Sequence, residues 1–302
     1  MLRQRICQDL GIPLGTLDTL ASTATFRYKR YKIPKRSHGF RVIDHPAREL
    51  KAVQRWLLRH VICRLPVHSA ARAYRNGIGI LENARPHQRS KYLLRMDIED
   101  FFPSITHLDI RSYINGNQEL FVDWDDEDID CFVKLVCRNG RLTIGAPTSP
   151  ALSNAICYDL DQRIGSICQE RGVVYTRYAD DMFFSTRSRG ILGDIEELVH
   201  QAIRDAELPR ALRVNERKTL HTSKRRKRVV TGLVITSEGR ISIGRNNKRY
   251  IRSLLHKYHT LDDEKKTRLA GKLAYVKAVE PEFINRLVLK YGVDLVKRAM
   301  RG

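Results

Sequence analysis

The sequence VVYTRYADDMFFS occupies residues 173–185. The apolar, aromatic and β-branched residues on either side of Ala179 predict two strands joined by a tight turn. This turn carries two adjacent carboxylates, Asp180 and Asp181, which repel each other unless a counter-charge lies nearby. A divalent cation with oxygen ligands is the usual counter-charge. An ordinary surface turn is the alternative interpretation, because aspartate is common in turns.

A third carboxylate follows another predicted strand upstream. Residues 92–96 are mostly apolar and deliver Asp97 at the end of the strand, shortly before Phe101 and Phe102. Functional side chains often lie where a scaffold element ends, although a helix cap is the alternative. In a sheet that makes these strands neighbours, the three aspartates can hold two metal ions about 4 Å apart. The pattern therefore predicts phosphoryl transfer, with Mg²⁺ favoured because every ligand is a hard oxygen.

The composition indicates a polyanionic partner. The 302 residues include 55 Lys and Arg against 34 Asp and Glu, a formal net charge of +21. Nucleic acid is favoured over an anionic membrane, and a merely soluble basic protein is the alternative.

None of the six cysteines has zinc-like spacing, so we expect these cysteines to be core residues in a reducing cytosol. The first seven residues lack the apolar core of a signal peptide, and no run approaches roughly 18 apolar residues, so we expect a cytoplasmic protein without a membrane partner.

The rest of the chain alternates helical and strand patterns. Residues 26–43 predict a basic hairpin with a turn at 35–39, able to lie over phosphates, and a plain amphipathic hairpin with a solvated cationic face is the alternative. The acidic run 123–128 predicts a solvated loop or helix start, with cation binding as the alternative. The run Lys224–Arg228 is expected to be a solvated face or a disordered loop. Residues 229–235 predict one strand with a partner at 239–243, and three helices are expected at 248–259, 262–279 and 281–300.

These residues, taken in order, resemble the motifs of reverse transcriptases. Residues 178–181 resemble the Tyr-x-Asp-Asp box, and Asp97 with Phe101 and Phe102 resembles the first catalytic motif. Residues 145–150 resemble the motif that positions template and nucleotide, and Asn215 with Lys218 and Thr219 resembles the motif after the box. Two further matches resemble signatures of bacterial retron reverse transcriptases: Asn83-Ala84-x-x-His87 and Val230-Thr231-Gly232. The resemblance covers about residues 26–300.

The resemblance implies an α+β fold, the right-hand polymerase. Fingers are expected at 1–90, a palm at 91–240 with finger insertions at about 105–145, and a helical thumb at 241–302. The palm would be an antiparallel sheet that carries the catalytic aspartates, with helices packed on it.

The resemblance also implies roles for individual residues. Asp97, Asp180 and Asp181 would be catalytic and, with Ile98, would bind two Mg²⁺ ions, for which Mn²⁺ can substitute. Phe102 would act as the steric gate that selects deoxynucleotides, and Lys218 would approach the triphosphate. The nucleotide-binding set is Lys35, Arg41, Asp100, Phe101, Phe102, Ala146 and Lys218. The nucleic-acid-binding set is Asn83, His87, Tyr178, Val230, Thr231, Gly232, Arg245, Lys248, Arg249 and Arg252.

The function implied is that of a retron enzyme, which uses dNTPs to copy part of its own structured non-coding RNA (msr-msd). Synthesis starts from the 2′-OH of a guanosine and gives branched msDNA, with RNase H supplied by the host. Such complexes act in antiphage defence with an effector protein encoded nearby. A group II intron-like reverse transcriptase and a non-catalytic RNA-binding inhibitor of a toxic effector are the alternatives. Ile144 departs from the Gln common in relatives, which removes any contact made by that side chain.

Overall fold

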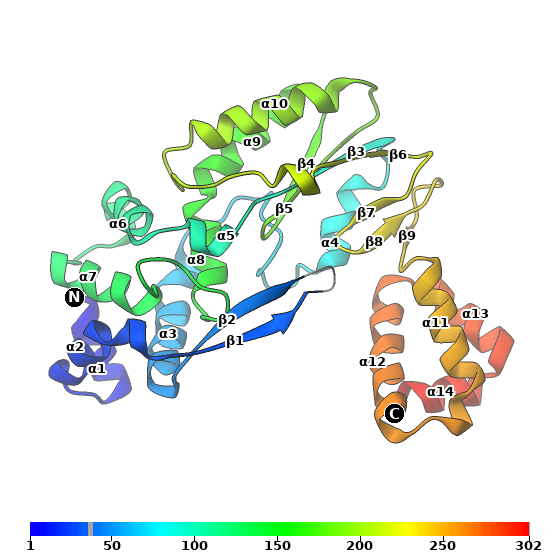
Figure 1. Cartoon of the computed structure of the whole chain (residues 1–302), viewed down its shortest axis with the longest axis horizontal. Coiled ribbons are helices and arrows are strands. Elements are labelled where there is room, and N and C mark those ends of the chain that lie inside the picture. Colours follow the sequence, from blue (N-terminus) through cyan, green and yellow to red (C-terminus); the bar gives the residue numbers. More distant parts are fainter. Residues whose placement is uncertain (36–38, 302) are drawn as a thin grey trace. The chain divides into compact units, whose positions relative to one another are not determined.

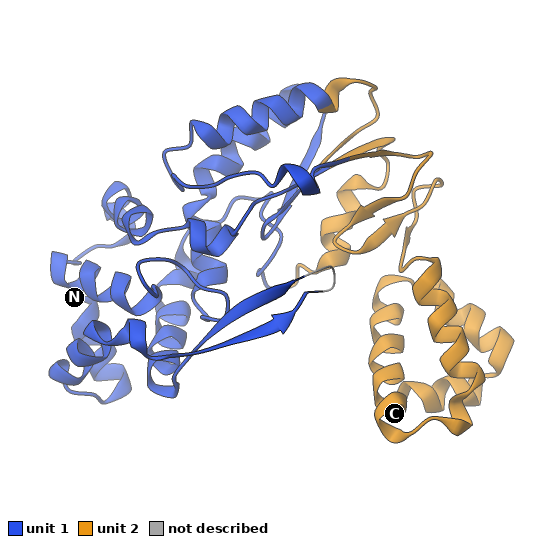
Figure 2. Ribbon diagram, in the orientation of Figure 1, with its two compact units in different colours: residues 1–76, 95–183, 193–220 blue, residues 77–94, 184–192, 221–302 orange. Residues whose placement is uncertain are grey.

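The computed structural model describes residues 1–35 and 39–301 (Figure 1). The chain divides into two compact units, which we describe separately (Figure 2). Unit 1 comprises residues 1–76, 95–183 and 193–220, and unit 2 comprises residues 77–94, 184–192 and 221–302. These units do not coincide with the expected fingers, palm and thumb, so that division of the chain stays a prediction.

Most of the helices of unit 1 are amphipathic and share a core that includes Ile6, Leu17, Leu50, Leu57 and Phe132. The acidic run that we expected to be solvated contributes one buried member. Asp128 is 2% exposed and accepts hydrogen bonds from the main-chain N–H groups of Leu2 (2.8 Å) and Arg3 (2.9 Å), which caps the first helix. The helices are α1 (Leu2–Leu10), α2 (Leu14–Ser22), η1 (Ala24–Phe26), α3 (Arg48–His60), η2 (Ile62–Arg64), α5 (Phe101–Ser104), α6 (His107–Gly116), η4 (Gln118–Leu120), α7 (Asp126–Val136), α8 (Ser149–Ile156), α9 (Tyr158–Glu170), α10 (Ile191–Arg204) and η5 (Glu216–Lys218).

Within the described residues, the strands form three sheets. The basic hairpin pairs β1 (Tyr28–Pro34) with β2 (Phe40–Pro46) in antiparallel register, and part of its expected turn, residues 36–38, lies outside the described residues. A four-stranded sheet has the order β4-β5-β3-β6, from β4 (Val174–Tyr178), β5 (Asp181–Thr186), β3 (Tyr92–Asp97) and β6 (Leu220–Ser223). The expected neighbour relation between the strands that carry Asp97 and Asp181 is therefore confirmed.

Unit 2 corrects two of our expectations. Residues 229–235 are not one strand, because Thr231 (φ 46°) and Gly232 (φ 84°) form a turn between two antiparallel strands. The last expected helix is broken at Gly292 (φ 84°), whose left-handed backbone ends a helix. The elements are α4 (Ile80–Ala84), η3 (Arg85–His87), β7 (Arg228–Val230), β8 (Leu233–Ile235), β9 (Ile241–Ser242), α11 (Arg245–His256), η6 (Tyr258–Thr260), α12 (Asp263–Val279), α13 (Pro281–Tyr291) and α14 (Val293–Arg301).

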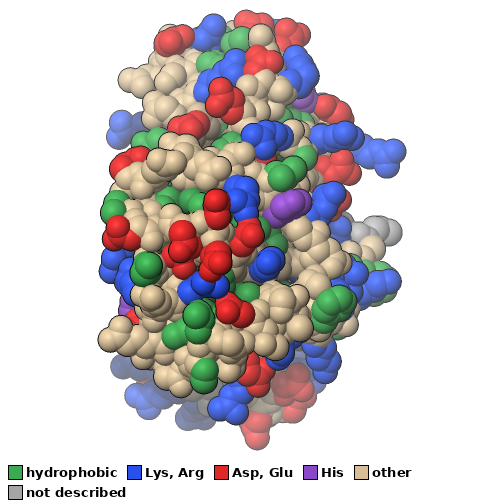
Figure 3. Space-filling model, turned by 90° about the vertical axis from the view of Figure 1, so that its left-hand side faces the viewer, with side chains coloured by type: hydrophobic (Ala, Val, Ile, Leu, Met, Phe, Trp, Pro, Cys, Tyr) green, Lys and Arg blue, Asp and Glu red, His purple; other side chains and the backbone are tan. Residues whose placement is uncertain are grey.

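The surface in Figure 3 carries acidic side chains interspersed with Lys and Arg, so the excess of positive charge is not concentrated on that face. Among the described residues, no helix is both long enough and apolar enough to cross a membrane.

Candidate active site

The turn between β4 and β5 presents the paired aspartates. Ala179 takes the left-handed conformation (φ 60°), which reverses the chain directly before Asp180. Buried, apolar β5 residues follow, including Met182 and Phe183. The strand pairing of this segment therefore fixes both carboxylates at the tip of the hairpin.

Main-chain hydrogen bonds bring Asp97 to the same place. The N–H of Ile98 donates to the carbonyl oxygen of Asp180 at 2.9 Å, and the N–H of Asn215 donates to the carbonyl oxygen of Asp97 at 2.7 Å. Asp97 itself is 3% exposed. The side chain of Ile98 has no ligand atom, so only its carbonyl oxygen could serve as the predicted metal ligand. All of these residues belong to unit 1, which brings the three aspartates together at one sheet end.

Two cations neutralise part of this negative charge. Lys218 Nζ lies 2.7 Å from Asp97 Oδ1, and Arg95 Nη2 lies 2.7 Å from Asp181 Oδ1. Asp180 makes no ion pair among the described residues. Arg95 was not predicted from the sequence, although it lies two positions before Asp97 and so projects from the same face of the strand. That spacing was the signal that could have identified it.

Burial raises the pKa of both hairpin carboxyl groups above the ordinary value. For Asp180 the neighbouring Asp181 carboxylate raises the pKa further. For Asp181 the Arg95 guanidinium partly offsets the rise. Buried carboxylates with incomplete charge compensation are a favourable environment for a divalent cation.

The donor set fits hard metal ions, because each of the three aspartates offers carboxylate oxygens. Among the described residues, only Glu196, His200 and Glu216 bring three potential ligand atoms within 4.8 Å of one another. At least one pair of the three aspartate carboxylates is therefore more than 4.8 Å apart. Lys218 and Arg95 hold two of these carboxylates in ion pairs. A divalent ion would take over the charge compensation that these two cations supply.

We expect Asp180→Asn to raise the melting temperature of the metal-free protein by about 2 °C or more. A carboxyl group with a raised pKa in the folded state destabilises the fold once it is ionised. This cost is absent below the ordinary value of 3.8 and grows as the pH rises through the shifted range. Thermal unfolding in chelator at pH 7 and at pH 4 measures it, and the gain should be much smaller at pH 4.

Asp181→Asn is the control for this prediction, because it also removes the partner of Arg95 and should give a smaller gain. An equal gain from both variants, or a gain at pH 4 as large as that at pH 7, would contradict the electrostatic explanation.

The segment after Asp97 carries two aromatic side chains that differ in exposure. Asp100 has a left-handed backbone (φ 43°) and precedes α5, which begins at Phe101. The Phe101 ring is buried (4% exposed), whereas Phe102 is half-buried and lies 6.2 Å from the ring of Tyr74. Phe102 is thus the more accessible ring of the pair, and Tyr74 is an aromatic neighbour that the sequence did not reveal.

The loop before α8 passes very close to β2. A Cβ atom on Gly145 (φ 124°) would lie 2.6 Å from the carbonyl oxygen of Asp44, so only glycine fits. The N–H of Asp44 donates to the carbonyl oxygen of Ile144 at 2.8 Å. Ala146 is 2% exposed as a whole residue, and its contact with a nucleotide stays a prediction.

The predicted finger cations lie at the far end of the β1–β2 hairpin. Arg41 is paired opposite Ile33, and the N–H of Lys35 donates to the carbonyl oxygen of Gly39 at 2.9 Å. Both basic side chains are exposed. Their contact with a triphosphate stays a prediction.

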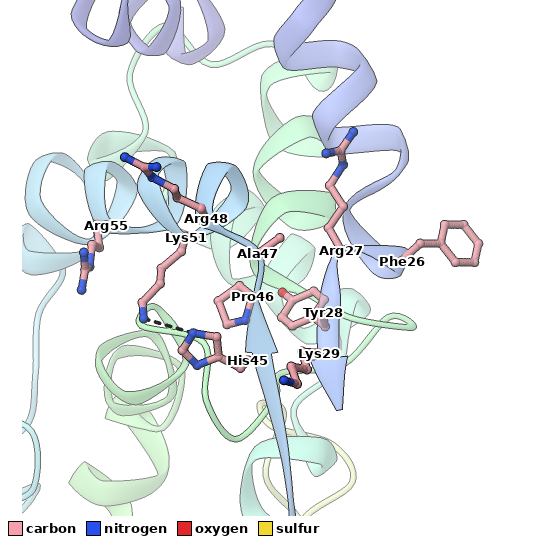
Figure 4. Close-up of a pocket in the computed structure, with 10 residues that line it drawn as sticks. All are labelled: Phe26, Arg27, Tyr28, Lys29, His45, Pro46, Ala47, Arg48, Lys51 and Arg55. Carbon is pink, nitrogen blue, oxygen red and sulfur yellow. Dashed lines mark hydrogen bonds between the residues drawn. The ribbon is translucent and has the colours of Figure 1, made fainter. Parts of the chain in front are cut away.

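A basic groove of about 610 Å³ lies at the base of the same hairpin (Figure 4). Lys51 points toward His45, with Nζ 3.4 Å from Nε2, whereas the Phe26 ring points away from the other side chains and is 85% exposed. Cations without a carboxylate, together with an exposed ring, suit a nucleic-acid strand. The residues that line the groove are Phe26, Arg27, Tyr28, Lys29, His45, Pro46, Ala47, Arg48, Lys51 and Arg55.

Three members of the predicted nucleic-acid-binding set are buried, and their role in binding stays a prediction. Asn83, His87 and Val230 are each 0% exposed, so their side chains cannot reach a nucleic acid in this structure. His87 Nδ1 lies 2.7 Å from Ser185 Oγ, and the Thr231 hydroxyl donates to the carbonyl oxygen of Ile80 at 3.2 Å. These contacts give the two signature segments a packing role within unit 2.

The remaining members of that set differ in accessibility. Arg245 and Arg249 are exposed on α11, and Gly232 is exposed at its turn. Lys248 is instead paired with Glu280 at 2.5 Å, and Arg252 lies over the Phe283 ring at 5.2 Å. Tyr178 is half-buried beside the catalytic turn. Contacts from the exposed residues stay predictions.

A buried ion pair behind the turn was missed altogether. Arg177 Nε donates to Asp161 Oδ1 at 2.8 Å, and Tyr175 donates to the same oxygen at 2.7 Å. Arg177 Nη1 also donates to the carbonyl oxygen of Ala179 at 3.2 Å. In sequence, Arg177 simply alternates with apolar neighbours along a strand, which gave no sign of burial.

Comparison with known proteins agrees with this geometry. Residues 33–235 match the family described as reverse transcriptase (RNA-dependent DNA polymerase). The chain is 36% identical to the Retron Ec83 reverse transcriptase of Escherichia coli, over 92% of this chain and 91% of that protein. It is 32% identical to the Retron Ec86 reverse transcriptase of the same species, over 95% and 90% of the two chains.

A solved structure supports the fold alone. Apo telomerase from Candida tropicalis superposes with a TM-score of 0.51 at 12% identity, covering 90% of this chain and 61% of that one. Membership of the polymerase family implies an RNA template and a divalent metal cofactor in general, and the three aspartates supply suitable ligands. The chain therefore belongs to the reverse transcriptase family, and its relatives identify it as a retron reverse transcriptase, an RNA-directed DNA polymerase.

Proposed function

We propose that this enzyme makes branched msDNA by copying a cognate msr-msd RNA from the 2′-OH of a guanosine in that RNA. The observation that carries the proposal is the 2.9 Å hydrogen bond from Ile98 to Asp180, which sets Asp97 beside the paired aspartates. Membership of the retron group supports the choice of RNA and of primer.

Asp97, Asp180 and Asp181 would hold two Mg²⁺ ions, with the Ile98 carbonyl as a further ligand and Mn²⁺ as a substitute. The ions would activate the priming hydroxyl and stabilise the leaving pyrophosphate. Lys218 is half-exposed (52%) and pairs with Asp97 through a single 2.7 Å contact. Its ammonium group is therefore free to turn toward the triphosphate once Asp97 is otherwise neutralised.

The incoming dNTP would lie between Phe102 and the exposed cations Lys35 and Arg41. Asp100, Phe101 and the Ala146 main chain would shape its site. The Phe102 ring would crowd a ribose 2′-OH and so select the deoxy sugar. The basic groove beside Lys51 would hold the RNA strand, and Arg245 and Arg249 would contact the duplex that forms.

Phe102→Val is expected to increase ribonucleotide incorporation relative to dNTPs by about 10- to 100-fold, because removing bulk from a discriminating pocket changes selectivity by that order. Primer extension with competing rNTPs and dNTPs measures the ratio. Phe101→Leu is the matched control, because its buried ring should affect stability and not sugar choice. Unchanged selectivity in Phe102→Val would remove this residue from the sugar pocket.

The proposed setting is the cytoplasm, with an effector protein encoded nearby, host RNase H, and a role in antiphage defence. Co-expression with the adjacent non-coding locus tests the priming. We expect an RNA-linked DNA whose DNA part is removed by DNase and which persists through denaturing gels. Free cDNA without a branch would favour a group II intron-like enzyme, and RNA binding without any DNA would favour the non-catalytic inhibitor.

A further inference from the structure

Three segments of unit 2, far apart in sequence, carry exposed basic side chains: residues 89–91, 187–189 and 224–227. We call their cations together the basic patch. It includes the run of cations after β6, whose role the catalytic site does not explain. Its members are Arg89, Lys91, Arg187, Arg189, Lys224, Arg225, Arg226 and Lys227.

Hydrogen bonds hold the three segments side by side. The N–H of Lys224 donates to the carbonyl oxygen of Lys91, and the N–H of Lys91 donates to that of Thr186, both at 2.9 Å. The Arg187 Nε donates to the carbonyl oxygen of Arg89 at 3.3 Å. The basic patch is therefore a continuous surface rather than three separate loops.

Arg228 anchors the end of this run. It is 1% exposed, and its guanidinium donates to the carbonyl oxygens of Ser90 and of Thr236, the latter at 2.5 Å. The turn 224–227 is thus fixed at one end by buried contacts and at the other by the Lys224 hydrogen bond. Because the turn is already held in this way, its backbone loses little conformational entropy when the surface binds a ligand.

The basic patch has no counter-charge of its own. Residues 83–96, 182–193 and 217–237 contain neither Asp nor Glu. Among the described residues, none of the eight cations forms an ion pair with a carboxylate. Eight neighbouring positive charges repel one another, so this surface is complementary to a regularly spaced polyanion.

The side chains favour a base-paired ligand. The three segments of the basic patch contain no Phe, Tyr or Trp on which unpaired bases could stack. Double-stranded RNA is bound mainly through its phosphates, its 2′-OH groups and its shape. We propose that the basic patch binds the backbone of a base-paired RNA stem. The inference rests on the proposed function, in which the enzyme works on a structured RNA.

The test uses the full-length chain without metal. One variant replaces Lys224, Arg225, Arg226 and Lys227 by Gln. The control replaces four exposed, unpaired cations of unit 1, Arg59, Arg64, Lys134 and Arg204, by Gln, and so lowers the net charge equally. The probes are an RNA duplex of about 16 base pairs, a DNA duplex and an oligo(U) strand of the same length, titrated at several salt concentrations.

We expect the patch variant to bind duplex RNA about 10- to 100-fold more weakly and to reduce the salt slope by roughly 3 to 4, since four phosphate contacts are lost. The control should change less than about threefold by the same reasoning. Equal losses in both variants would overturn the proposal. An equal loss for oligo(U) or duplex DNA would overturn the choice of a base-paired RNA.

DNA synthesis on a short, unstructured, primed template separates this inference from the proposed function. We expect the patch variant to retain that synthesis. A wild-type chain that makes no branched DNA with its cognate RNA would refute the proposed function, whereas the difference in RNA binding would still decide the role of the basic patch.

Discussion

The double variant Asp180→Asn, Asp181→Asn is expected to lower DNA synthesis about a thousandfold or more while leaving RNA binding within about twofold. Removing one charge-stabilising group from an active site typically costs 100- to 1000-fold, about 3–4 kcal/mol, and here two metal ligands are lost together. Asparagine keeps the size of each side chain, so the turn at Ala179 has no steric reason to rearrange. Single-turnover extension of a primed RNA template measures the effect.

Asp194→Asn with Asp205→Asn is the matched control, because both residues are exposed in unit 1 and the charge change is the same. The control should retain full activity. Asp97→Asn alone should match the double variant within about tenfold, since residues that act as one unit are strongly non-additive. Robust synthesis by the double variant would show that the aspartates do not hold the catalytic metal.

Local sequence patterns were sufficient to predict the hairpin and the strand end that carry the three aspartates. The apolar runs around Ala179 predicted the hairpin, and the strand before Asp97 predicted its position at a strand end. The pairing that joins them through Ile98 involves residues about 80 positions apart. No local pattern contains such a contact, so it rested on the resemblance to a known family until the structure gave the distance.

The corrections have a common physical origin, which is that burial and backbone reversal depend on tertiary contacts. Asn83 and His87 were assigned to nucleic-acid binding only through the resemblance to a family signature, and the fold buries both side chains. Thr231 has a β-branched side chain that favours strand, but the pairing of β7 with β8 forces a left-handed turn there. Gly292 lies inside the helix that we expected at 281–300, and a glycine at that position is a sequence signal for the observed break.

Asp161→Asn is expected to destabilise unit 1 by about 3–5 kcal/mol, because it leaves the Arg177 guanidinium buried without a counter-charge. Arg177 and Asp161 are 1% and 0% exposed. Burial lowers the pKa of Arg177, but the Asp161 carboxylate raises it by more. The pKa of Arg177 therefore lies above its ordinary value. Chemical denaturation monitored by fluorescence measures the change. Asp205→Asn, which breaks the exposed pair with Arg163, should cost less than about 1 kcal/mol.

The double variant Asp161→Leu, Arg177→Met separates stability from positioning. Replacing both charges by apolar side chains should recover most of the lost stability, because neither charge is left buried and unpaired. It still removes the 3.2 Å hydrogen bond from Arg177 to the carbonyl oxygen of Ala179, directly before the paired aspartates. We therefore expect a stable protein whose rate of DNA synthesis falls about 10- to 100-fold, since small misplacements of catalytic groups have effects of that size. Full activity in this variant would show that the ion pair contributes to stability alone. A stable but slow enzyme would show that the pair fixes the position of Asp180.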